Sequence, residues 1–439
     1  MPLSSQRQRE ILEALRRGTV PRRGLEAFAV GLERFGPAFQ DDLAFVGRGG
    51  SVFKALRGEY GSGKTFLARW LQDQAQRVGF VTAEVQVSET ETPLHRLETV
   101  YRRMMERLST DDVPQGAFRS IVERWFYVLE QDVLTGGTIA SDDAEALRQR
   151  SAELLEARLQ PLSQVAPTFA AALRGYRQAQ THGDRATADA LLAWVSGQPN
   201  VGAQAKRASG LKGEVDHFAA LGFIHGLLLV LRDAGHTGLV VVLDEVETLQ
   251  RVRRDVREKA LNALRQWIDE IDGGRFPGLY LAITGTPAFF EGSQGVALLP
   301  PLSQRLATHF DADPRFDNPR APQVRLQNFD LESLVAVATR VRAIYVEGNP
   351  NAERILARVD DGYVDTLARV VVGKLGGRVG VAPRLFLKKL VADILDRVDL
   401  YADFDPRRDY RLTLEEGELN RVERNATAVE RPDDIELDL

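Results

Sequence analysis

The stretch that decides the fold runs Val52-Phe-Lys-Ala-Leu-Arg-Gly58-Glu-Tyr-Gly61-Ser62-Gly63-Lys64-Thr65. An apolar strand leads into a loop with the spacing Gly-x-x-x-x-Gly-Lys-Thr, and the six residues after it have helical composition. The glycines of such a loop let backbone N–H groups turn inward around phosphate oxygens, and the helix N-terminus adds partial positive charge. The sequence therefore predicts a strand–loop–helix phosphate site.

Each residue of this loop has an expected role. We expect Lys64 to reach the β- and γ-phosphates of a nucleoside triphosphate, and the Thr65 hydroxyl to ligate Mg²⁺. The other residues expected to hold the nucleotide are Gly58, Gly61, Ser62, Gly63 and Phe66. The expected ligands are therefore ATP and Mg²⁺.

A second motif ends a β-branched run, Gly238-Leu-Val-Val-Val-Leu-Asp244-Glu245-Val-Glu247. The run predicts a buried parallel strand, and its end has the form of a Walker B motif. We expect Asp244 to hold the Mg²⁺ shell and Glu245 to orient or deprotonate the attacking water, with Glu247 behind them. Acidic residues are also common in the first turn of a helix, which is the alternative explanation of Asp244-Glu245. The pair is strong evidence for a nucleotide site only together with the phosphate loop.

A third strand, predicted at 278–283, ends in Thr284-Gly-Thr286-Pro. A polar residue at its tip would lie between the two Walker strands, at the position called sensor 1 in AAA+ ATPases. Thr284 is the first choice for this catalytic position and Thr286 the second. A plain Gly-Pro turn is the alternative.

Two arginines complete the expected site. Arg305 ends a predicted helix where AAA+ proteins place a finger aimed into the neighbouring subunit, and such a guanidinium stabilises the charge of phosphoryl transfer. Arg315 and Arg320 compete for this role. Arg384, in the first turn of a later helix, matches a sensor 2 arginine that folds onto the phosphates. An ordinary surface arginine is the alternative in each case.

The chain has 439 residues, more than one ordinary core holds. Lys64 and Asp244 lie much further apart along the chain than a minimal crossover requires, which indicates a helical insertion between them. The expected parts are an N-terminal helix (1–24), the core (25–110 and 217–328), the insertion (111–216), a helical lid (329–402) and a polar tail (403–439). Residues 18–31 are expected to cover the adenine.

In the lid, Asp330 has the form of an N-cap for a helix that ends near Tyr345. A second helix is predicted at about Val364–Leu375. A third begins near Pro383 and presents one apolar face.

The composition excludes several kinds of functional site. The chain has no cysteine, which excludes a disulfide framework, a thiolate zinc site and a cysteine nucleophile. No apolar run reaches the length of a membrane-spanning helix, and the N-terminus lacks a signal peptide, so a cytoplasmic protein without membrane contact is expected. The net charge of −5 gives no global bias toward nucleic acid.

Along its whole length the chain resembles the AAA+ ATP-binding proteins of bacterial BREX phage-defence systems, the BrxD family. The segments that carry this resemblance are Arg57–Phe66, Glu84–Leu97, Leu243–Leu249, Ile283–Phe290 and Ala382–Leu387. The resemblance implies a role in restricting phage DNA, beside a large helicase and a methylation machinery.

The expected fold class is α/β: a AAA+ P-loop NTPase core, with a parallel sheet flanked by helices, a large helical insertion and a helical lid. The expected function is an ATPase that forms a homo-oligomer and couples ATP binding and hydrolysis to DNA remodelling or to assembly of the defence complex. Two alternatives stay open: a nucleotide-dependent switch with slow turnover, and an adaptor that recruits the helicase without touching DNA. The acidic net charge makes the adaptor a serious rival of the DNA-remodelling ATPase.

Overall fold

The centre of the molecule is a five-stranded sheet in a computed structural model that describes residues 3–136, 144–375, 383–419 and 423–424. The strands lie in the order β2-β3-β4-β1-β5, and all the pairings are parallel. They are β1 (Val52–Arg57), β2 (Val81–Gln86), β3 (Leu239–Asp244), β4 (Leu279–Gly285) and β5 (Gln323–Arg325). The fold is therefore α/β, as expected, and its parallel strands bring their carboxyl ends to one edge.

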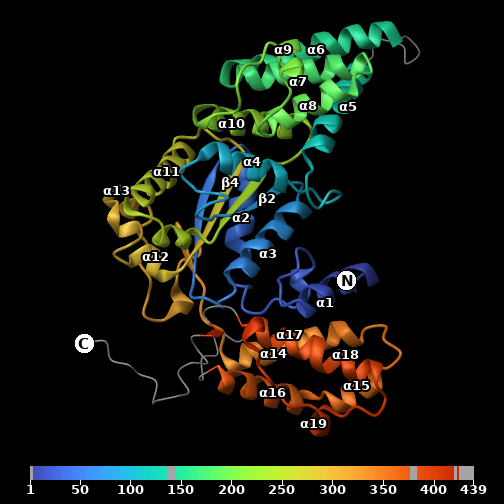
Figure 1. Ribbon diagram of the computed structural model, residues 1–439, viewed down its shortest axis with the longest axis vertical. Coiled ribbons are helices and arrows are strands. Elements are labelled where there is room, and N and C mark those ends of the chain that lie inside the picture. Colours follow the sequence, from blue (N-terminus) through green and yellow to red (C-terminus); the bar gives the residue numbers. More distant parts are fainter. Residues whose placement is uncertain (1–2, 137–143, 376–382, 420–422, 425–439) are drawn as a thin grey trace.

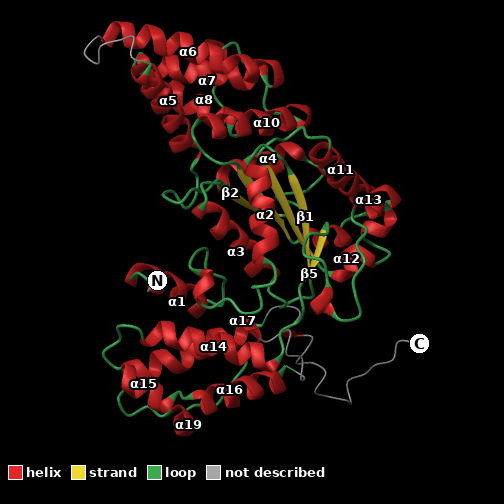
Figure 2. Cartoon of the chain, turned by 180° about the vertical axis from the view of Figure 1, so that it is seen from behind, coloured by secondary structure: helices red, strands yellow, loops and turns green. Residues whose placement is uncertain are grey.

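Helices cover both faces of the sheet, as a parallel sheet requires (Figure 2). Every residue of β3 and β4 is buried. One face packs against α2 (Gly36–Gly47) and α3 (Lys64–Arg77). The other packs against α4 (Leu97–Arg107), α10 (His217–Asp233) and α11 (Arg254–Asp272). Two short helices, α12 (Pro287–Glu291) and α13 (Pro300–Arg305), follow β4.

A helical group lies at one end of the molecule, beyond α4 and α10 (Figure 1). Its helices are α5 (Phe118–Thr135), α6 (Ala144–Val165), α7 (Pro167–Thr181), α8 (Arg185–Val195) and α9 (Ala203–Ala208). Phe223 of α10 contacts the rings of Tyr101, Phe169 and Trp194, which belong to α4, α7 and α8. The helical group therefore shares one apolar core with this face of the sheet.

A second helical group lies at the opposite end (Figure 1). It contains α14 (Leu331–Val346), α15 (Ala352–Arg358), α16 (Asp361–Lys374), α17 (Pro383–Lys388), a π-helical stretch (Lys389–Leu395), α18 (Asp396–Leu400) and α19 (Pro406–Asp409). The predicted cap is confirmed, because the side chain of Asp330 accepts a hydrogen bond from the Ser333 N–H at 2.7 Å. The second predicted helix begins three residues earlier than expected, at Asp361. The polar tail predicted at 403–439 is described only to residue 419 and at 423–424.

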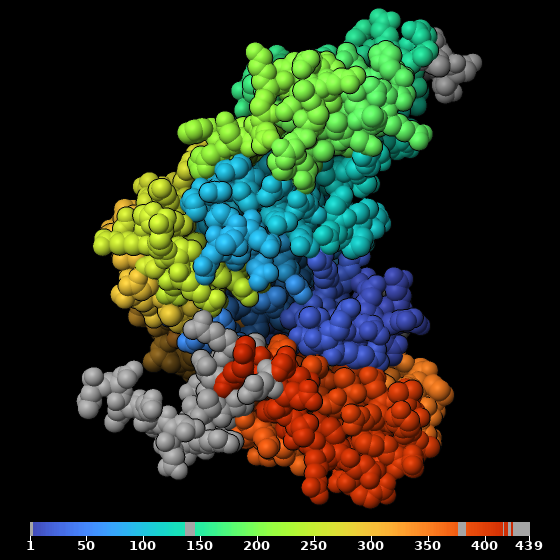
Figure 3. Space-filling view, in the orientation of Figure 1, coloured from blue at the N-terminus to red at the C-terminus, as the bar shows by residue number. Residues whose placement is uncertain are grey.

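The N-terminal helix α1 (Ser5–Arg16) packs on this second group. Arg16 donates two hydrogen bonds to Asp396, at 2.7 and 2.8 Å, and Gln8 donates to the Glu347 carbonyl at 2.9 Å. In the space-filling view the N-terminal segment fills the space between the core and this second group, residues 331–409, which we call the lid (Figure 3). The two ends of the chain therefore contribute to one helical unit.

Candidate active site

The loop at residues 58–63 joins β1 to α3 and needs its glycines. Gly61 and Gly63 have φ values of +84° and +89°, in the left-handed region that side chains disfavour. A Cβ on Gly58 would lie 2.2 Å from Ser62 Oγ. The chain can therefore turn tightly here, and the N-terminus of α3 opens toward the cavity described below.

Lys64 is the first residue of α3 and is 8% exposed. Its Nζ donates hydrogen bonds to the carbonyls of Gly58 and Glu59, at 2.8 and 3.0 Å. Burial lowers the pKa of Lys64, and the nearby carboxylates of Glu247 and Asp244 oppose that shift. The ammonium group is thus held at the loop, where it can exchange these carbonyls for phosphate oxygens.

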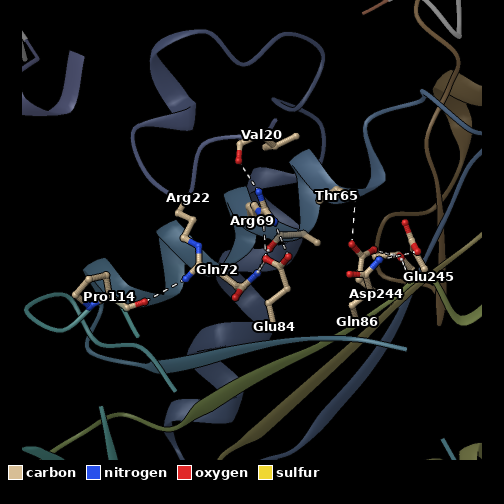
Figure 4. A network of polar contacts seen from close by, with 12 residues as sticks. Val20, Arg22, Thr65, Arg69, Gln72, Glu84, Gln86, Pro114, Asp244 and Glu245 are labelled. Carbon is tan, nitrogen blue, oxygen red and sulfur yellow. Dashed lines mark hydrogen bonds and ion pairs between the residues drawn. The ribbon is translucent and has the colours of Figure 1, made fainter. Parts of the chain in front are cut away.

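Asp244 ends β3 and lies at the centre of a short chain of hydrogen bonds. Thr284 Oγ1 donates to Asp244 Oδ1, and the Glu245 N–H donates to Thr284 Oγ1 at 3.0 Å. Thr65 Oγ1 donates to Asp244 Oδ2 at 3.3 Å (Figure 4). Thr284 can reach both acids because β4 lies between β1 and β3 in the sheet. Burial raises the pKa of Asp244, while the Thr284 hydroxyl lowers it.

Glu245 adopts a left-handed backbone conformation, with φ = +61°. For a non-glycine residue this costs about 1–3 kcal/mol, and such strain is concentrated at functional sites. Its Oε2 accepts a hydrogen bond from Gln86 Nε2 at 2.9 Å, and Gln86 is the last residue of the neighbouring strand β2 (Figure 4). Gln86 is not among the residues that the sequence predicts for the site. The parallel pairing of β2 with β3, which places Gln86 beside the end of β3, would have indicated its position.

Glu247 lies on the cavity wall and is only 4% exposed, although we expected it behind the site. Its Oε2 has no hydrogen-bond partner within the described part of the chain. Burial raises the pKa of Glu247, and the charge of Lys64 opposes that shift. The site therefore presents three acids, Asp244, Glu245 and Glu247, at one side of the loop.

A second polar network lies beside the Asp244 group, between α3 and β2 (Figure 4). Arg69 of α3 donates two hydrogen bonds to Glu84 of β2, at 2.9 and 2.7 Å, and also donates to the Val20 carbonyl. Although burial opposes it, Arg69 lowers the pKa of Glu84. This bidentate pair fixes α3, β2 and the N-terminal segment relative to one another.

The loop opens into a cavity of about 730 Å³. Its polar part contains Lys64, Thr65, Asp244 and the two glutamates, together with the loop residues Gly61, Ser62 and Gly63; Phe66 of α3 also lines it and contacts the ring of Phe28. Its apolar part is formed by the N-terminal segment and the lid, through Leu15, Val20, Phe28, Val30, Val337 and Leu387. One apolar end and one polar end suit a ligand that has a flat base and a chain of phosphates.

The four candidate arginines occupy different places. Arg384 lines the cavity, where it pairs with Glu423. Arg315 also lines the cavity and pairs with Asp313. Arg305 is absent from the cavity lining and donates to Asp269 and, at 2.7 Å, to the Pro301 carbonyl. Arg320 pairs with Asp41 at 2.8 Å. All the expected loop and acidic residues except Gly58 line the cavity. Gly58 and Thr284 do not line it but are hydrogen-bonded to Lys64 and Asp244, which do. Arg305 neither lines the cavity nor contacts these residues through a hydrogen bond described above.

The donor set fits Mg²⁺. The Thr65 hydroxyl and the Asp244 carboxylate are hard oxygen ligands 3.3 Å apart, and Mg²⁺ is usually held by one or two carboxylates together with phosphates and water. The described residues include no group of three or more His, Cys, Asp or Glu that could hold a metal ion. A magnesium ion here would be held by the Thr65 and Asp244 oxygens together with phosphate oxygens and water.

Comparisons with known proteins agree with this geometry. A family model described as "BREX system ATP-binding protein BrxC/D" matches residues 3–414. No curated protein and no solved structure matches the chain. None of the helices in the described ranges is long and apolar enough to span a membrane.

Proposed function

The chain belongs to the family of BREX system ATP-binding proteins BrxC/D, and from this we propose that it is a AAA+ ATPase of the BrxD type that hydrolyses ATP. The observation that carries the proposal is the hydrogen-bonded group of Thr65, Asp244, Thr284 and Glu245 beside Lys64. A phosphate cradle alone binds nucleotides, whereas an acid held at the far side of the γ-phosphate can act on water.

Each residue has a definite part in this proposal. Lys64 binds the β- and γ-phosphates, and the loop N–H groups orient them. Thr65 and Asp244 hold Mg²⁺, which neutralises charge on the phosphate oxygens. Glu245 orients and deprotonates the attacking water, and Thr284 fixes the backbone that carries Glu245. Arg384 binds the phosphates from the lid side.

We further propose that the chain works as a cytoplasmic homo-oligomer with DNA, a helicase and other defence proteins as partners. The position of Arg305 supports an assembly. Arg305 does not line the cavity of its own chain, so an arginine finger at this position would act in the site of a neighbouring subunit. The net charge of −5 supports the competing adaptor function, in which the chain recruits the helicase and touches no DNA.

ATP turnover tests the proposal when it is measured with and without duplex DNA, at low and at moderate salt. We expect DNA to stimulate turnover, more at low salt, and Glu245→Gln to abolish it while ATP still binds. Glu258→Gln is the matched control, since Glu258 lies exposed on α11 and should leave turnover unchanged. ATP binding without turnover would support the switch, and turnover indifferent to DNA would support the adaptor.

A further inference from the structure

The C-terminal segment places an acid on the arginine of the cavity. Glu423 is 0% exposed, and its carboxylate accepts hydrogen bonds from Arg384 Nε, at 3.0 Å, and from Arg384 Nη2. The same Nη2 donates to the Glu418 carbonyl at 2.6 Å. Arg384 is therefore held by side-chain and backbone oxygens of one short segment.

The two lysines that follow on the same helix are held in the same way. Lys388 and Lys389 donate to the two oxygens of Glu418, at 2.8 and 2.7 Å. Although burial opposes it, these two ammonium groups hold the pKa of Glu418 at about 2. Three cations of the lid thus face two acids from the C-terminal segment.

This contact lies at the nucleotide cavity itself. Arg384 and Glu423 both line the cavity that contains Lys64 and Thr65. Gly18, in the N-terminal segment, also lies close to the guanidinium: a Cβ there would lie 3.1 Å from Arg384 Nη1. The guanidinium therefore has little room to serve a phosphate while it keeps its present partners.

A carboxylate and a phosphate offer a guanidinium the same pair of oxygen acceptors. The forked bond from Arg384 to Glu423 therefore uses donors that a nucleotide phosphate would need. A buried carboxylate beside a triphosphate also adds repulsion, and a buried ion that loses its partner is strongly destabilised. Arg384 cannot form its full set of hydrogen bonds to a phosphate and to Glu423 at the same time.

We propose that Glu423 takes the place of a nucleotide phosphate at Arg384, so that the C-terminal segment competes with ATP for the lid arginine and weakens ATP binding. The inference rests on the proposed function, because it takes the cavity to be the ATP site. Displacement of Glu423 from Arg384 frees the guanidinium and raises the affinity for ATP.

Equilibrium binding of a fluorescent ATP analogue to the full chain tests this in a double-mutant cycle. Glu423→Gln keeps the shape and removes the charge, and we expect it to tighten binding about tenfold. In an Arg384→Ala background the gain should be clearly smaller, because only the relief of charge repulsion remains. Glu415→Gln is the matched control, because Glu415 lies exposed on the same segment and its replacement should leave affinity unchanged.

Unchanged or weaker binding by Glu423→Gln, or an equal gain in the Arg384→Ala background, would overturn the inference. Glu423→Ala in the full chain removes the same carboxylate and should show the same gain, so it decides the question if Glu423→Gln does not fold. Absence of binding by every variant would refute the ATP site itself. Binding by the wild-type chain that Glu423→Gln leaves unaltered would refute only the competition.

Discussion

At the scale of single residues, Thr284 connects the two acids that the proposed hydrolysis would use. Its side chain is fully buried, it donates to Asp244, and it accepts from the Glu245 N–H. Thr284→Val keeps the shape and removes both hydrogen bonds, and an unsatisfied buried polar group costs about 1–3 kcal/mol. Because Glu245 would shift, we expect kcat to fall on the order of 10²-fold while KM for ATP changes little.

Steady-state kinetics of the Val and Ser variants test this prediction. Thr284→Ser keeps the hydroxyl and should restore most of kcat, which simple loss of packing would not explain. Wild-type kcat in Thr284→Val would show that Thr284 does not position Glu245.

Glu247 gives a second prediction, because two glutamates lie at the cavity and only one is expected to act on water. Glu247→Gln removes a buried negative charge beside the phosphates, so we expect ATP binding to tighten by up to about tenfold while turnover persists. Nucleotide binding and turnover of Glu247→Gln and Glu245→Gln should be measured side by side. Loss of turnover in Glu247→Gln and its survival in Glu245→Gln would reverse the two assignments.

The residues of the site differ in how far the sequence could predict them. The phosphate loop and the acids at the end of β3 are each encoded by a spacing within a few residues. The structure brings Lys64 and Asp244 to one cavity. Gln86 reaches Glu245 only because β2 and β3 are neighbours in the sheet, and strand order is not written in any local pattern. Glu423 meets Arg384 across 39 residues that contain no motif.

At the scale of elements, α1 stabilises the lid through Arg16 and Asp396. The pair is partly buried, and Asp396 also accepts from the Tyr345 hydroxyl at 2.8 Å. Asp396→Asn removes the charge and one acceptor, and hydrogen bonds to charged groups contribute about 1.5–3 kcal/mol. We expect amide hydrogen exchange in α1 to accelerate about tenfold or more.

Hydrogen exchange followed by mass spectrometry, on peptides that cover residues 5–16, measures this effect. Asp365→Asn is the control, since Asp365 pairs with Arg369 on the exposed side of α16 and should leave α1 unchanged. Equal exchange in both variants would show that α1 is held by its apolar face alone.

The sequence predicts α1 and the first lid helix well, because a capping side chain and an apolar stripe are local signals. It does not say where α1 docks, since any apolar stripe can pack on any other. The last long lid helix contains the π-helical stretch Lys389–Leu395, which the 3.6-residue period does not reveal. Tertiary contacts decide such features.

At the scale of the whole molecule, the two helical groups lie at opposite ends of the sheet (Figure 1). The group at 118–208 joins the sheet through one aromatic cluster around Phe223, on the face away from α3. The lid and α1 pack on the other side and complete the cavity. The candidate nucleotide site therefore lies beside the second helical group, and the first group offers a surface remote from that site.

The proposed assembly can be tested with variants of Arg305. Arg305 does not line its own cavity, whereas Arg315 does. If Arg305 acts in a neighbouring subunit, Arg305→Ala and Glu245→Gln are each inactive alone, but a mixture regains turnover. Roughly one interface in four of an equal mixture pairs a live site with an intact arginine. Arg320→Ala, which removes only a surface pair with Asp41, should stay active. Full activity of Arg305→Ala, with loss in Arg315→Ala that mixing does not rescue, would place the arginine in the same chain.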